Sequence, residues 1–421
     1  MKKEKWLLKE IDKWGEESLI SADTVRILKE RYSSGKSANT LIVLFSIIGS
    51  ILIGAGIILL AAKNWYYFPK SLKVIIAYLP LLVSQALSVY VVKVKYSSLA
   101  WRESVSILLS ASVFTVVALV GQIFHFYGDF GAYVLACGLL VLPAIYILNA
   151  AAPLVVYYWT IINWAALDHS VQNAPILLGL FAAGALFVFL NRNSDSARLL
   201  YMTWITVIEG FAVSLLMGII LNSSLLLIAL CYFTLLLSVE KLPESLLVPF
   251  KIAGTSGALI TLAILTYESM WNYFSDAVRA GGMLLAGIML IAALYFSIMT
   301  FRADRLKTLF AIALIFMCLA RLSWSIFGLD TGPYDIILTF ISNIVLFSIG
   351  VGFILHGVKN ISLLTTNIGM TAICALIIMR FLDSGMDFLW RGIIFVVLGL
   401  AFLMANLKIL NKKKTRSEGI L

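Results

Sequence analysis

The sequence predicts an all-α membrane protein, a polytopic bundle of about fourteen transmembrane helices with a lower limit of twelve. Three observations predict it. Of the 421 residues, 61% are hydrophobic and only 13% are charged, which leaves too few charges to cover a soluble globule. Apolar runs near the length of a membrane span recur from Leu41 onward. Lys and Arg residues concentrate in every second connection between these runs, as cytoplasmic loops require.

The same composition excludes several classes of protein. A mean hydropathy of +0.98 argues against a soluble enzyme, a disordered chain and a nucleic-acid-binding module. The four cysteines lie inside apolar runs without the spacing of metal ligands, and we expect reduced, buried thiols. They are Cys137, Cys231, Cys318 and Cys374. No cofactor and no metal are expected.

Residues 1–38 precede the first apolar run and read as a cytoplasmic amphipathic helical hairpin. Ile11 and Trp14 follow helical spacing, Gly15 ends the first helix, and Ser21 is a plausible N-cap for the second. The segment contains no apolar stretch of signal-peptide type, so we expect the first span to be retained. Two interpretations stay open: a solvated segment against the membrane, or a module that binds a protein partner.

Residues 39–408 are expected to form the transmembrane bundle, and residues 409–421 a basic cytoplasmic tail. Helical spans are favoured because a β-barrel would show alternating segments of about ten residues. The predicted spans are 41–62, 71–92, 104–124, 131–149, 151–167, 175–190, 199–220, 223–239, 252–267, 280–300, 307–327, 335–356, 361–380 and 388–407.

The basic residues give this layout an orientation. With a cytoplasmic N-terminus, 25 of the 32 Lys and Arg residues fall on the cytoplasmic side. This asymmetry explains the net charge of +10 as topology and attraction to anionic lipid. Both termini are then expected in the cytoplasm, which requires an even number of spans.

Glu209 is the clearest candidate for function inside a span, since it lies near the middle of the run 199–220. An ionisable group at that depth is costly and usually faces the bundle interior or a wet cavity. One interpretation is a carboxyl that joins helices by hydrogen bonding. The other is a site for a proton or a cation.

A second candidate is a set of polar residues that the predicted topology places at similar depth near the outer face. Arg and Lys donors suit phosphate or carboxylate, so these residues predict a site for an anionic lipid headgroup or solute, with Arg380 and Asp383 at its centre. The alternative is an ion-pair network that only fastens the spans together. The residues are Lys63, Asn64, Trp65, Gln122, His125, Asp129, Arg321, Arg380, Asp383 and Arg391.

Several local patterns together resemble an uncharacterised bacterial family of predicted membrane proteins, domain of unknown function 2157. They are Trp14-Gly15 with Leu19-Ile20, Gly54-Ala55-Gly56 followed by Ala61-Ala62-Lys63-Asn64-Trp65, and Gly121-Gln122-Ile123-Phe124-His125-x-x-Gly128-Asp129. The resemblance is strongest over residues 5–170. It implies an integral protein of the bacterial cytoplasmic membrane and assigns no activity.

Three functions follow from these observations. The first choice is a transporter or flippase-like protein for an anionic solute or lipid-linked substrate. The second is a membrane scaffold or sensor that acts through residues 1–38. The third is an intramembrane enzyme that uses His125 and Asp129, although no known hydrolase or nucleotide-binding motif occurs. Membrane lipid is the expected partner, and nucleic acid is not.

Overall fold

A computed structural model describes residues 10–15, 17, 19–21, 23–25, 28, 65–126, 128–192, 196–239, 244–272, 280–300, 305–327, 332–382, 393, 396, 400, 403 and 404. Their regular structure is helical, with no strand among them. The chain forms two compact units, Met1–Ile76 and Ala77–Leu421.

In the first unit, the described part of the N-terminal segment agrees with two short helical pieces that pack on each other. Residues 10–15 and 23–25 are helical. A methyl group built on Gly15 would lie 2.8 Å from a Cγ atom of Val25, and Ile11 is only 1% exposed. A short 3-10 helix, η1 (Trp65–Tyr67), precedes the first long helix.

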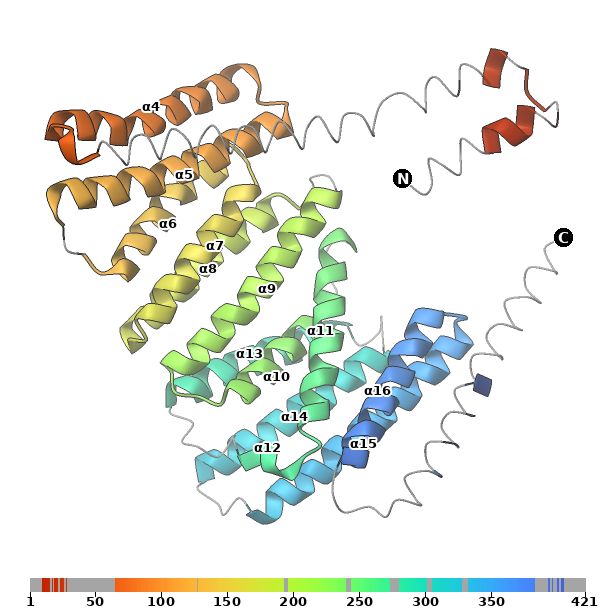
Figure 1. Cartoon of the computed structure of the whole chain (residues 1–421). Helices are drawn as coiled ribbons and strands as arrows, with labels where there is room; N and C mark the ends of the chain where they lie inside the picture. The colour runs from red at the N-terminus through yellow and green to blue at the C-terminus, as the bar shows by residue number, and fades with distance from the viewer. Residues whose placement is uncertain are drawn as a thin grey trace. The chain divides into compact units, whose positions relative to one another are not determined.

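Helices follow one another through the rest of the chain (Figure 1). Their bounds are α4 (Lys70–Val94), α5 (Leu99–Phe124), α6 (Phe130–Ile147), α7 (Ala152–Leu167), η2 (Val171–Asn173), α8 (Ala174–Leu190), α9 (Ser196–Ile220), α10 (Leu225–Ser238), α11 (Glu244–Ile264), α12 (Glu268–Asn272), α13 (Ala280–Thr300), α14 (Arg305–Phe327), α15 (Gly332–Lys359) and α16 (Leu363–Leu382).

The all-α fold is confirmed, and each predicted span within the described residues coincides with a helix. Nine described helices are long and apolar enough to cross a membrane, and α7, α10 and most of α16 are shorter apolar helices. The predicted spans 41–62 and 388–407 lie outside the described residues, apart from isolated positions of the second. The count of fourteen therefore stays a prediction.

Two features differ from the predicted spans. Helix α11 begins at Glu244, eight residues before the predicted start, because the charged residues Glu244 and Lys251 near its beginning hide the helix from a search for apolar runs. Helix α15 begins at Gly332, three residues before the predicted span 335–356, so Asp335 lies in its first turn and is only 2% exposed. The helix begins early enough to carry this carboxylate into the protein.

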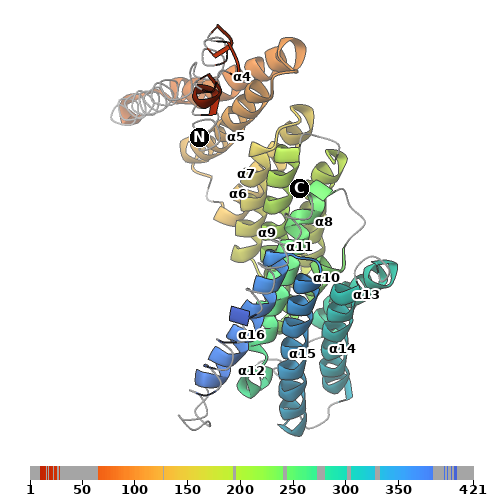
Figure 2. The same ribbon diagram turned by 90° about the vertical axis from the view of Figure 1, so that its right-hand side faces the viewer.

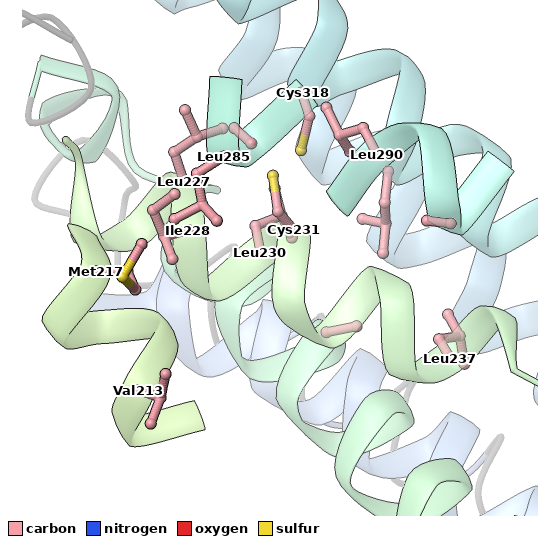
Figure 3. Packing of buried hydrophobic residues seen from close by; sticks show 14 of the residues in the cluster. Val213, Met217, Leu227, Ile228, Leu230, Cys231, Leu237, Leu285, Leu290 and Cys318 are labelled. Carbon is pink, nitrogen blue, oxygen red and sulfur yellow. The ribbon is translucent and has the colours of Figure 1, made fainter. Parts of the chain in front are cut away.

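The core centres on α10, which packs against α9, α11, α13 and α14. Most of its side chains are buried. Figure 3 shows Leu230 and Cys231 of this helix with Leu285 and Leu290 of α13, and the Cys231 sulfur faces that of Cys318 on α14. All four cysteines are free thiols, and three of them are buried.

Close helix contacts depend on glycines where backbones approach. Helices α15 and α16 form an antiparallel hairpin and lie side by side in Figures 1 and 2. A methyl group on Gly369 would lie 2.5 Å from the Gly350 carbonyl oxygen and 2.8 Å from the Ile354 nitrogen. Small residues commonly let membrane helices approach in this way.

Candidate functional site

A groove in the second unit lies between α4, α5 and α6 and has a volume of about 1040 Å³. Its wall is mainly apolar. The wall residues include Tyr78 and Leu81 of α4, Val116 and Val117 of α5, and Tyr133 and Leu140 of α6.

One end of the groove is polar, because α5 ends there and α6 begins. His125 terminates α5 in a left-handed conformation with φ 53°, which His adopts more readily than most residues. The Phe126 N–H donates to the Gly121 carbonyl at 2.9 Å and closes the turn. Asp129 is the N-cap of α6. Gln122, His125 and Asp129 all line the groove, so the structure brings these three predicted residues together.

Contacts behind the wall fix the position of the three helices. The Ser112 hydroxyl shares its proton between the Leu108 carbonyl of α5 at 2.7 Å and the Pro80 carbonyl of α4 at 3.1 Å, and so joins α5 to α4. The Tyr133 hydroxyl donates to the Phe114 carbonyl at 3.1 Å and joins α6 to α5. Polar contacts of this kind hold membrane helices together without a hydrophobic driving force. The groove therefore has a defined shape, apolar along its length and polar at one end, which fits an amphiphile.

Glu209 does not line the groove. It lies halfway along α9, is half-buried and is near Tyr158 of α7. Among the described residues, no hydrogen bond or ion pair to Glu209 is found. The expectation of a carboxyl at mid-depth agrees with this position, whereas its role as a proton or cation site stays a prediction.

Arg321 lies on α14, which packs against α10, α13 and α15, and is also absent from the groove lining. It is 2% exposed and so is Asp335 of α15, and the two opposite charges attract each other. The sequence did not indicate Asp335 as the partner of Arg321, because Asp335 stands at the very end of a predicted span and its burial depends on how α14 packs against α15.

A polar stripe follows Asp335 along one face of α15. The Asn343 amide donates to the Thr339 carbonyl at 2.8 Å and to the Thr266 carbonyl at 3.3 Å. The spacing of Asp335, Thr339 and Asn343 by four residues in an apolar run was the available signal, since such residues share one helix face. Nearby, the Tyr267 hydroxyl donates to the Met379 carbonyl at 2.7 Å, so the end of α16 that carries Arg380 lies beside the end of α11.

The remaining predicted residues lie in the first unit or outside the described part of the chain. Trp65 belongs to η1 in the first unit. Lys63, Asn64, Asp383 and Arg391 lie outside the described residues, as does the side chain of Arg380. Among the residues that the structure describes, no group of three or more His, Cys, Asp or Glu side chains could hold a metal ion.

The resemblance seen in the sequence is confirmed by comparison with protein families. Residues 12–154 match the family described as "Predicted membrane protein (DUF2157)". The match includes the whole groove and its polar end. No curated protein and no solved structure matches the chain. The chain is a predicted membrane protein with several apolar helices that can cross a membrane.

Proposed function

We propose that this protein binds and moves an amphiphilic, lipid-linked substrate across the membrane, as a transporter or flippase-like protein. The observation that carries the proposal is the groove between α4, α5 and α6. Its wall is mainly apolar, and Gln122, His125 and Asp129 stand together at one end, where they could hold a headgroup. Ligand sites combine this mainly apolar lining with a few placed polar groups.

The headgroup contacts would come from Gln122, His125 and Asp129. An amide, an imidazole and a carboxylate offer both donors and acceptors. The anionic character expected of the substrate depends on Arg380 and Arg391, whose side chains lie outside the described residues. Helix α16, which carries Arg380, packs on α15 and α11, so this anionic preference is proposed for a place apart from the groove.

The test is to fill the groove without disturbing the fold. Nothing lies within 4 Å of a methyl group built on Gly121, a lining residue. Gly121→Leu should therefore project into the groove. Gly179→Leu is a matched control, since a methyl group on this glycine of α8 also meets nothing within 4 Å and the residue does not line the groove.

Each variant would be reconstituted with a phospholipid that carries a photoreactive diazirine on its acyl chain. We expect the wild type and Gly179→Leu to be crosslinked at α5 or α6, and Gly121→Leu to lose most of this crosslink and most transbilayer movement of a fluorescent phospholipid. Equal crosslinking and lipid movement in all three proteins would contradict the proposal.

The second candidate is a scaffold or sensor that acts through residues 1–38. The packing of Gly15 against Val25 and the burial of Ile11 favour it, since a self-packed hairpin can present a defined surface. Deletion of residues 1–36 decides between the two functions. Loss of the cellular phenotype with lipid movement intact would favour the sensor.

A further inference from the structure

A charged cluster ties together four helix ends at the membrane boundary opposite the polar end of the groove. We call it the clasp, and it comprises Arg102, Glu103, Asn149 and Arg198. Arg102 lies in the first turn of α5, whose other end carries His125. At 1.5 Å per residue, about 35 Å separates them, which exceeds the hydrocarbon thickness of a bilayer.

Glu103 caps α7, which begins 49 residues later in the chain at Ala152. Its carboxylate accepts hydrogen bonds from the Ala151 N–H at 2.8 Å and the Ala152 N–H at 2.7 Å. These N–H groups at the start of α7 have no partner in their own helix, and the positive end of the helix dipole favours a carboxylate. The Glu103 carboxylate is therefore bound to groups within the protein.

Two arginines converge on the turn between α6 and α7. Asn149 makes this turn with φ 46°. Arg198 Nη2 donates to the Asn149 carbonyl at 2.6 Å, and Arg198 Nε lies 3.8 Å from a Glu103 oxygen. Arg102 Nη1 donates to the same carbonyl at 3.2 Å. With two guanidinium groups and one carboxylate, the clasp keeps one positive charge in excess.

Of the two arginines, Arg102 is the one that can bind an anion from outside the protein. The Arg198 side chain is only 9% exposed, whereas Arg102 is half-buried, lies 5.0 Å from the centre of the Tyr96 ring and makes its hydrogen bond through Nη1. Arg102 Nε is buried, so the donor left for an external acceptor is the second terminal nitrogen, Nη2, of the planar guanidinium fork.

The surroundings of Arg102 are those of a membrane interface. Lys93 and Lys95 are exposed at the end of α4. Tyr90 and Trp101 are 43% and 45% exposed and contact each other edge to face. Such rings anchor at the headgroup level, where the cations would meet lipid phosphates.

We propose that the clasp binds the phosphate of an anionic phospholipid, with Arg102 as the direct ligand. Lys95 adds charge from α4, and Glu103 and Arg198 position Arg102 through Asn149. The bound lipid would lie against the joint between α5, α7 and α9. This site is separate from the groove and does not depend on the function proposed for it.

The test compares the full-length protein in nanodiscs of phosphatidylcholine alone and of phosphatidylcholine with phosphatidylglycerol. We expect the anionic lipid to raise the melting temperature of the wild type. Arg102→Gln should lose most of this increase, and Arg102→Lys should keep part of it because charge remains without the fork. Native mass spectrometry should show about tenfold weaker retention of phosphatidylglycerol for Arg102→Gln, the effect of losing one charge-assisted hydrogen bond.

Two controls make the result specific. Arg192→Gln removes an exposed arginine from the turn between α8 and α9 and should keep the full response to phosphatidylglycerol. Gly121→Leu should also keep it, whatever happens to lipid movement, which separates this proposal from the groove. The proposal is overturned if Arg102→Gln lowers the melting temperature equally in both nanodiscs, or if Arg192→Gln loses the response to the same extent.

Discussion

Substitution of Glu209 can show whether its carboxyl is needed for packing or for activity. It lies at the midpoint of α9, half-buried and near Tyr158. We expect Glu209→Gln to keep the fold, because the amide preserves the shape and the hydrogen-bonding capacity of the carboxyl. Glu209→Leu should disturb packing or activity. Expression, thermal stability and lipid movement would be measured for both variants, and equal values for both would show that the carboxyl does nothing specific.

Arg380 and Asp383 allow a second test at the residue scale, because positions three apart share a helix face if the helix continues through both. A ligand site and a structural ion pair respond differently to change. Arg380→Lys keeps charge but loses bidentate geometry, and a ligand site predicts impaired transport with little change in stability. The exchange Arg380→Asp with Asp383→Arg should fail for the same reason. Wild-type transport in both proteins would mean that these residues form only a structural ion pair.

The packing of α15 on α16 depends on glycine, because a side chain at Gly369 would meet the backbone of the neighbouring helix. Gly369→Ala should separate α15 from α16, since the added methyl would meet the backbone of Gly350 and Ile354. Overpacking of this kind costs about 1–3 kcal/mol. Gly287→Ala is the control, because nothing lies within 4 Å of its added methyl. Detergent-induced unfolding of both variants checks this, and equal midpoints would contradict the close approach.

Element bounds followed from the sequence because apolar runs of span length leave one structural solution in a bilayer. The proximity of Gln122, His125 and Asp129 also followed, since one helix ends and the next begins between them. The groove did not, because its shape depends on how side chains of α4 pack against α5 and α6. The clasp was missed because Glu103 meets its partners 48 residues away, a separation that leaves no local signal.

At the scale of the whole molecule, the topology depends on whether the short central helix α10 crosses the membrane. Helix α10 has 14 residues, about 21 Å of helix against a hydrocarbon core of about 30 Å. Most of its side chains are buried by neighbouring helices, so its ends can meet protein and not lipid. We infer that it crosses despite its length.

The crossing of α10 can be measured, because the number of spans between two segments decides whether they lie on the same side of the membrane. Four helices, α9, α10, α11 and α13, separate the segment near Arg192–Arg198 from that near Arg302–Lys307. If all four cross, both segments lie on the same side, and the basic residues predict the cytoplasm. Fluorescent-protein fusions at both should be active, while alkaline phosphatase should be active near Asp129 and near Asp330–Asp335. Phosphatase activity at Arg302–Lys307, kept near Asp129 and lost near Asp330–Asp335, would mean that one of the four helices does not cross, because removing one span reverses every segment that follows it. Helix α10 is the shortest of the four.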